Sequence, residues 1–252
     1  MFAAAAWLGL SNSVPTAQAA PDARCFELRT YYAAPGKLDD LNARFRQHTT
    51  KLFAKHGMEN LGYWMPTENS DNRLIYLLAY PSREARETSW KAFGADPAWQ
   101  AAMKASEANG KLVAKAEVRF LQLTDFSPAV KTGDVAKGGV FEMRTYTTPA
   151  GRLPNLDARF RDHTVKLFPK HGIQNWAYFH DAPGQAGADT TLLYFVMHPS
   201  PAAAKTAFDA FRVDPDWIAA RTASEQAAGG SLTVSNGMKS VFLKPTDYSA
   251  TK

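Results

Sequence analysis

Two histidines, His48 and His163, stand at matching places in two stretches of the chain that share most of their residues. Each lies in a run of apolar residues spaced three or four apart, so we expect both to point from a helix into the cleft beside a sheet. A buried imidazole can titrate near neutral pH and serve as an acid, a base or a haem ligand. The alternative is a core histidine bonded to a backbone carbonyl, which burial alone does not distinguish.

A second group of chemical side chains lies in an alternating stretch, Phe26 to Tyr31, which the second half of the chain repeats at Phe141 to Tyr146. The period of two predicts a strand with apolar side chains on one face and Glu, Arg and Tyr on the other. We expect the polar face to turn away from the helices, toward the space between two packed sheets. The candidate ligand-binding residues on this face are Arg29, Tyr31, Arg144 and Tyr146.

An arginine without an acidic partner on this face could bind a carboxylate or phosphate through two parallel hydrogen bonds. The alternative is that Arg29 pairs with Glu27 and Arg144 with Glu142, so that these pairs hold the two halves of the protein together. Buried charges persist mainly when they are paired, which favours the alternative. A further arginine, Arg44, belongs to a basic stripe that is typical of a solvated helix face.

Aromatic residues form the third candidate group. A cleft lined by Trp64, Tyr76 and Trp90 would favour flat apolar ligands, although such clusters more often pack a core. Phe179 and Phe208 replace the two tryptophans in the second half of the chain. We therefore expect any functional difference between the halves at these two positions and at Pro169, which replaces Ala54.

These candidates belong to a duplicated unit. Residues 26–57 recur as residues 141–172, and 20 of these 32 positions are identical without a gap. Each copy predicts the order β-α-β-β-α-β of a ferredoxin-like unit, with both helices on one face of an antiparallel sheet. The predicted parts are a signal peptide at 1–20, a first repeat at 24–127, a linker at 128–139 and a second repeat at 140–249.

A sheet with helices on only one face leaves its other face bare, and that face needs a partner. The second copy can supply it within the same chain. The sequence therefore predicts an α+β protein in which two ferredoxin-like units pack sheet to sheet as an intrachain pseudo-dimer, enclosing a barrel. Association of several such chains into a homo-oligomer stays open.

The first twenty residues predict export. An apolar stretch from Phe2 to Leu10 precedes Ala17-Gln18-Ala19, the small-x-small pattern that a signal peptidase cleaves. Nine apolar residues are too few to cross a bilayer core of about 30 Å, so we expect no membrane span in the mature chain. No basic residue precedes the apolar stretch, so the true start could lie upstream of Met1. The expected location is the periplasm or the exterior.

Composition restricts the partners. The net charge of +5 comes from lysines and arginines scattered among acids, which does not favour nucleic acid. Cys25 is the only cysteine, so no disulfide can form within the chain. We find no glycine-rich phosphate loop, no metal-binding Cys or His pair and no nucleophile elbow. The sequence therefore predicts no metal and identifies no cofactor.

A family resemblance rests on several of these residues together. The pattern Glu27-x-Arg29-x-Tyr31, a helix ending in LFxKHG, the pair Tyr63-Trp64, and Trp90 followed by Asp96-Pro97-x-Trp99 resemble the NIPSNAP family of dimeric α+β barrels. The resemblance covers nearly all of the chain after residue 20, in two tandem copies. It implies the barrel fold but no general catalytic residues, and animal members are associated with mitochondria and protein interactions. Related barrels include cofactor-free monooxygenases, haem-degrading enzymes and lactone isomerases.

Three functions stay open at this point. The first is binding of a small apolar or aromatic molecule in a helix-to-sheet cleft. The second is an oxygenase- or isomerase-type enzyme with His48 or His163 as the acid–base residue. The third is a protein-interaction module without a ligand. An open cavity that touches either histidine would favour the first two, and a filled cleft would favour the third.

Overall fold

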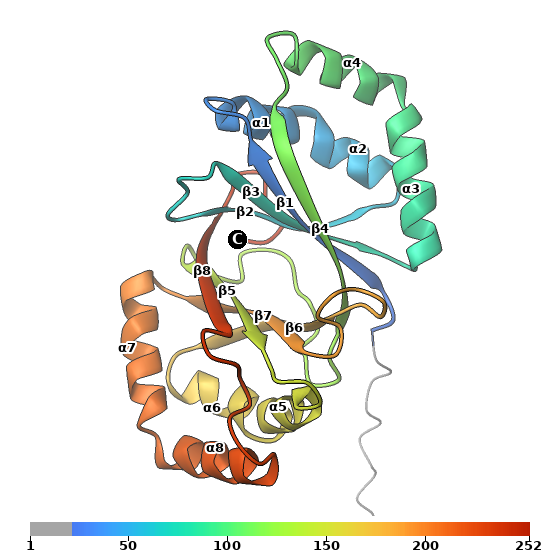
Figure 1. The fold of residues 1–252 in the computed structure, drawn as a ribbon. Coiled ribbons are helices and arrows are strands. Elements are labelled where there is room, and N and C mark those ends of the chain that lie inside the picture. The colour runs from blue at the N-terminus through green and yellow to red at the C-terminus, as the bar shows by residue number, and fades with distance from the viewer. Residues whose placement is uncertain (1–21) are drawn as a thin grey trace, which may run out of the picture.

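The structure is a computed structural model that describes residues 22–252, and the predicted signal peptide lies outside these residues (Figure 1). Both halves follow the predicted order β-α-β-β-α-β, with each helical region divided in two. The first repeat contains β1 (Cys25–Ala33), α1 (Leu38–Arg44), α2 (Thr50–Lys55), β2 (Glu59–Pro66), β3 (Arg73–Tyr80), α3 (Arg83–Ala95), α4 (Pro97–Ser106) and β4 (Val113–Leu123). The second contains β5 (Val140–Thr147), α5 (Leu153–Arg159), α6 (Val165–Lys170), β6 (Gln174–Asp181), β7 (Thr191–His198), α7 (Pro201–Arg212), α8 (Pro215–Ala227) and β8 (Met238–Pro245).

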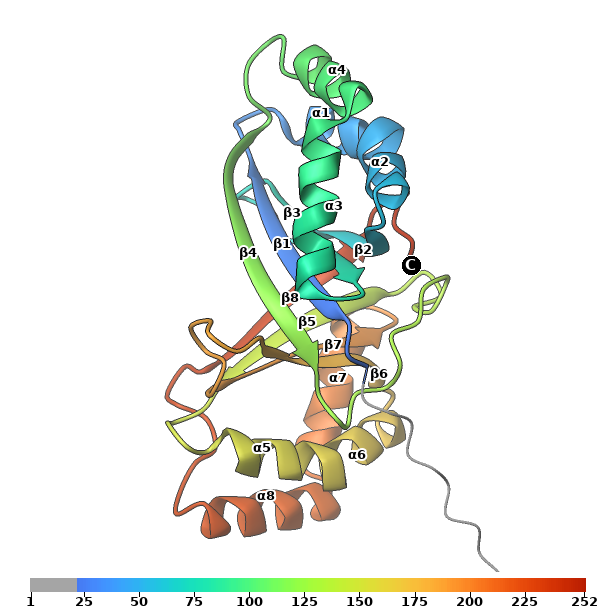
Figure 2. The ribbon, with the colours of Figure 1, turned by 90° about the vertical axis from the view of Figure 1, so that its right-hand side faces the viewer.

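The two sheets form one closed antiparallel barrel in the order β1-β3-β2-β8-β5-β7-β6-β4. Each repeat supplies four neighbouring strands, and short pairings of β2 with β8 and of β4 with β6 join them. The predicted pseudo-dimer barrel is therefore confirmed, with edge pairing as the connection between the sheets. Helices α1–α4 cover the outer face of one sheet and α5–α8 that of the other, so the helices lie at opposite ends of the molecule (Figures 1 and 2).

Apolar side chains from both repeats fill the barrel interior. Phe26 and Leu28 of β1 point inward, where Trp64 lies within 5.5 Å of Phe141 and 5.7 Å of Trp176, measured between ring centroids. The expectation that Glu27, Arg29 and Tyr31 face this interior is wrong, because they lie on the other face, under the helices. An eight-stranded barrel has just enough room for its own side chains, so its interior takes the apolar face of each strand.

Aspartates at the starts of α4 and α8 fix the positions of the helices around each cleft. Asp96 accepts a hydrogen bond from the backbone N–H of Ala98 at 2.8 Å, which caps α4. It also accepts from Lys55 and His56 at the end of α2, each at 2.7 Å. Hydrogen bonds from Lys55, His56 and the backbone hold the pKa of Asp96 well below its usual range. Asp214 has the same role in the second repeat.

The end of each repeat packs against the other repeat. Phe126 lies against Phe160 and Tyr178 of the second repeat, and Tyr248 packs against the first repeat in the same way. Asp125 accepts two hydrogen bonds from Arg161, both at 2.7 Å, beside this contact. This reciprocal exchange adds a second connection to the strand pairings that close the barrel.

Candidate functional site

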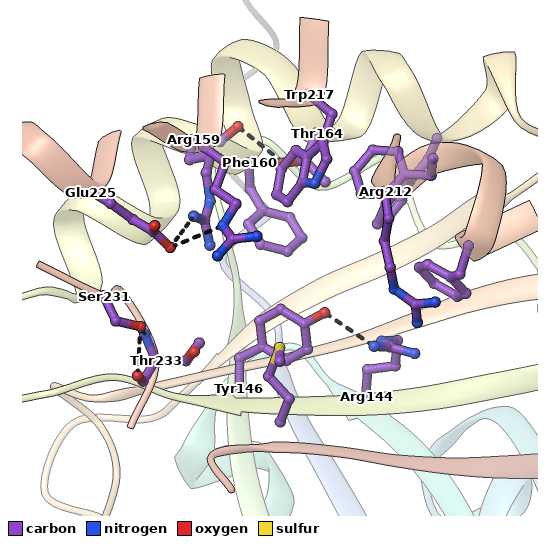
Figure 3. A pocket seen from close by; sticks show the side chains of 15 residues that line it. Arg144, Tyr146, Arg159, Phe160, Thr164, Arg212, Trp217, Glu225, Ser231 and Thr233 are labelled. Atoms are coloured by element: carbon purple, nitrogen blue, oxygen red, sulfur yellow. Dashed lines mark hydrogen bonds and ion pairs between the residues drawn. The ribbon is translucent and has the colours of Figure 1, made fainter. Parts of the chain in front are cut away.

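A cavity opens between helices and sheet in each repeat. The cleft of the second repeat has a volume of about 360 Å³, against about 210 Å³ in the first. In both, an aromatic wall meets a floor formed by the polar face of the first strand of the repeat. The second cleft is lined by Arg144, Tyr146, Arg159, Phe160, Thr164, Phe168, Phe208, Phe211, Arg212, Trp217, Arg221, Glu225, Ser231, Thr233 and Met238 (Figure 3).

A π-helical turn decides which side chains enter each cleft. The segment Phe45–Thr49 between α1 and α2 is π-helical, and the backbone N–H of Thr50 donates to the carbonyl of Phe45 five residues earlier. This turn holds one more residue than an α-helical turn, so the positions after it rotate on the helix surface. Thr49 and Phe53 are buried in the cleft as a result, and His48 is exposed.

The second repeat has the same π-helical turn at Phe160–Thr164. Thr164 and, four residues later, Phe168 line the cleft there, and His163 is exposed. The expectation that His48 and His163 point into the clefts is therefore wrong. A helix with the α-helical period throughout would have placed them there, and the inserted residue of the π turn moves them outward. His48 lies instead on a surface groove between α1 and α4.

A buried acid organises the floor of the second cleft. Glu142 accepts hydrogen bonds from Arg144, from Ser240 and, at 2.9 Å, from His198. Burial disfavours its charged form, but the His198 hydrogen bond, the charge of Arg144 and the Ser240 hydroxyl outweigh this and lower the pKa of Glu142. The predicted Glu–Arg pairing is confirmed, but both partners belong to one strand. The pair therefore does not hold the two halves together.

The same acid in the first repeat has different partners. Glu27 accepts from Arg29 at 2.6 Å, from Arg86 at 2.7 Å and from Tyr80 at 2.9 Å. Trp90 donates to it as well, at 3.0 Å, and the Arg29 guanidinium lies 4.3 Å from the centre of the Trp90 ring. These contacts fill the space around Arg29, which does not line the first cleft.

The other predicted ligand-binding residues divide between cleft and core. Tyr31 and Trp90 line the first cleft, and Arg144 and Tyr146 line the second. Trp64 lies in the barrel interior and is completely buried, so its predicted place in a cleft is wrong. Strand β2 turns this residue inward because Tyr63, its neighbour, occupies the helix-facing side.

The structure adds an arginine that sequence analysis did not select. Arg159, at the end of α5, is only 6% exposed and lines the second cleft. Its nearest acidic group is the Glu225 carboxylate, 3.6 Å away, which is beyond hydrogen-bond distance. Burial lowers the pKa of Arg159. Its counterpart Arg44, expected on a solvated face, is also buried, because its guanidinium lies over the ring of Trp99.

Two further arginines distinguish the clefts. Arg212 of α7 and Arg221 of α8 line the second cleft, where the first repeat has Gly94 and Met103 at the matching positions. We expected a functional difference between the repeats at Trp64 and Phe179, but both side chains lie in the barrel interior and line neither cleft. Alignment of the two helical regions from Asp96-Pro97 and Asp214-Pro215 could have revealed both arginines.

Two absences characterise residues 22–252. No group of three or more Cys, His, Asp and Glu side chains there is arranged to hold a metal ion. No helix in that part of the chain is both long and apolar enough to cross a membrane.

Comparisons with known proteins agree with this fold. The NIPSNAP family matches the chain over residues 26–128 and again over 141–250. An uncharacterized NIPSNAP domain protein from Burkholderia xenovorans is 22% identical over 41% of this chain and 98% of its own, with a TM-score of 0.37. No curated protein matches the chain.

Two longer structures cover both repeats. A presumed monooxygenase from Lactobacillus acidophilus NCFM is 10% identical, covers 91% of this chain and 96% of its own, and has a TM-score of 0.57. An anthrone oxidase-like protein is 12% identical, covers 89% of this chain and 92% of its own, and has a TM-score of 0.53. At these identities the likeness concerns the fold alone.

Proposed function

The chain belongs to the NIPSNAP family, and on this premise we propose that it binds a small aromatic or apolar molecule in the cleft of its second repeat. The observation that carries the proposal is the open cavity of about 360 Å³ between α5–α8 and the sheet. Pockets for small molecules have volumes of about 300–1,000 Å³, so this one suits a compact ligand. The first cleft falls below this range.

The chemistry of the walls supports a flat ligand. Phe168 and Phe211 meet edge to face, with ring centroids 5.0 Å apart, and Trp217 lies 4.5 Å from Phe211. Such rings offer both faces and edges to a further aromatic ring, which gains stability by stacking or edge contact. Tyr146 and Arg144 supply polar groups at the floor, which would fix the orientation of the ligand.

The enzyme alternative loses its candidate residues. Neither cleft is lined by His48 or His163, so neither histidine is placed to act as an acid or base on a ligand there. Other barrels of similar fold carry oxidase or monooxygenase names, but their identity to this chain is too low to transfer a reaction. An interaction module with filled clefts is disfavoured by the open cavity.

A substitution at the cleft mouth tests the proposal. Met238 is 58% exposed and lines the second cleft, so a tryptophan there should fill the opening without disturbing the core. We expect Met238→Trp to weaken binding of N-phenyl-1-naphthylamine, an apolar fluorescent probe, by at least about tenfold in a fluorescence titration.

The matched control is Ala116→Trp. Ala116 pairs with Tyr31 as Met238 pairs with Tyr146, so it occupies the same place at the first cleft. This variant and His163→Ala should keep the wild-type affinity. Absence of saturable binding by the wild type, or equal affinity of Met238→Trp, would refute binding in the second cleft.

A further inference from the structure

The charge of the second cleft is not balanced. Four arginines line it, whereas Glu225 is the one acid among the lining residues. Glu142 neutralises Arg144 from beneath the floor, and Asp209 pairs with Arg212 on the exposed side at 2.6 Å. Arg159 and Arg221 are left with one carboxylate between them, at 3.6 Å and 3.4 Å. The cleft therefore has an excess of positive charge.

Arg159 is the buried member of this set. Its guanidinium makes no hydrogen bond within residues 22–252, and its Nε is enclosed without an acceptor. Burying a charged group without such a bond costs free energy. The Glu225 carboxylate at 3.6 Å and the Trp217 ring at 5.2 Å lie beside the guanidinium, which can still donate to a further acceptor. Figure 3 shows this guanidinium between Glu225 and the aromatic side chains of the cleft.

In the first repeat the matching arginine forms side-chain hydrogen bonds. Arg44 donates to Glu107 at 3.0 Å and lies 3.4 Å from the Ser106 hydroxyl. One arginine and one acid line that smaller cleft, so its charges balance. The duplication has kept the buried arginine and its acid, Glu107 or Glu225, in both copies. Nε has no acceptor in either copy, but only in the first repeat do the other guanidinium nitrogens form hydrogen bonds.

Resting on the small-molecule binding proposed above, we propose that the ligand is an aromatic carboxylate whose carboxylate group pairs with Arg159. A planar carboxylate matches the fork of a guanidinium and forms charge-assisted hydrogen bonds with it. Its ring lies against the aromatic side chains of Phe211 and Trp217. Arg221 at the rim adds attraction for the approaching anion.

Two ligands of the same shape but different charge separate the contribution of ligand charge to binding from that of ligand shape. 2-Naphthoate carries a carboxylate, and 2-naphthamide replaces it with a neutral amide on the same ring system. We expect the wild-type protein to bind naphthoate at least about tenfold more tightly than naphthamide in isothermal titration calorimetry, since only the carboxylate forms an ion pair with the guanidinium.

Variants then assign this preference to Arg159. Arg159→Met replaces the guanidinium, which lies 5.2 Å from the centre of the Trp217 ring, with an apolar side chain. It should reduce the preference to less than about twofold, with a much larger loss of affinity for naphthoate than for naphthamide. Arg44→Met, the matched change in the first repeat, should leave the preference intact. Circular dichroism and thermal unfolding establish that each variant is folded.

A second variant has the opposite expected effect and does not depend on the folding of Arg159→Met. Glu225→Gln removes the acid that competes for Arg159, on a residue that is partly exposed. It should tighten naphthoate binding by about threefold or more and increase the preference for naphthoate over naphthamide.

The outcomes are distinct. Equal binding of both probes to the wild type, a preference that survives Arg159→Met, or weaker naphthoate binding by Glu225→Gln would refute the carboxylate assignment while small-molecule binding stands. Failure of both naphthalene probes and of N-phenyl-1-naphthylamine to bind the wild type would refute the binding site itself.

Discussion

Replacing Glu142 with alanine is expected to lower the free energy of unfolding by about 3–5 kcal/mol, the usual cost of removing one partner from a buried ion pair. Glu142 is 2% exposed and accepts hydrogen bonds from Arg144, His198 and Ser240. Its removal leaves the Arg144 guanidinium buried without its acid. Urea unfolding followed by circular dichroism measures the change.

The matched control is Asp125→Ala. Asp125 also pairs with an arginine, Arg161, but both side chains are well exposed. A surface ion pair contributes about 0–1 kcal/mol, so this variant should unfold close to the wild type. Equal stability losses in Asp125→Ala and Glu142→Ala would show that burial does not set the strength of the Glu142 network.

The pH dependence of the same pair has a definite sign. The pKa of Glu142 is lowered in the folded protein, so folding favours its ionised form. Its contribution to stability is therefore complete above the unfolded-state pKa of about 4.3 and decreases as the pH falls below that value. Glu142→Gln should remove this part of the acid destabilisation, which thermal unfolding between pH 3 and pH 7 would detect. An unchanged slope below the carboxylate pKa would contradict the assignment.

The second large effect is expected in the barrel interior. Trp64→Ala should cost about 3–5 kcal/mol, because it removes a large buried ring and leaves a cavity that close-packed neighbours cannot fill. Trp64 contacts Phe141, Trp176 and Phe195, all from the second repeat. The substitution should therefore weaken the association of the two repeats and also destabilise the first repeat itself.

Two comparisons make this result specific. Phe179→Ala changes the matching position of the second repeat, which is also fully buried in the interior, and should cost a similar amount. Ile218→Ala, at a residue 49% exposed on α8, should change stability by less than about 0.5 kcal/mol. The folded fraction of Trp64→Ala should retain its affinity for N-phenyl-1-naphthylamine. A stable Trp64→Ala protein that has lost probe binding would instead place this residue in a ligand site.

Much of the architecture follows from local patterns along the chain. The gapless match of 26–57 with 141–172 establishes two copies of one unit, and the alternation in β1 establishes which of its residues share a face. Both depend only on neighbours in sequence, so they can be read without knowing the fold. The bare sheet face then required a partner, which the second copy supplies in the closed barrel.

Tertiary structure decided which face of each strand points into the barrel and which side chains of each helix line the cleft. Alternation is the same for either orientation of a strand, and only closure of the barrel sends Phe26 inward and Glu27 toward the helices. The prediction for His163 requires the α-helical period along the whole helix. A single π turn changes that period, so Thr164 lines the cleft in place of His163. The distance between Arg159 and Glu225 depends on α5 and α8, which meet only in the folded chain. The residues alone therefore specified a cleft, and packing specified how its charges pair.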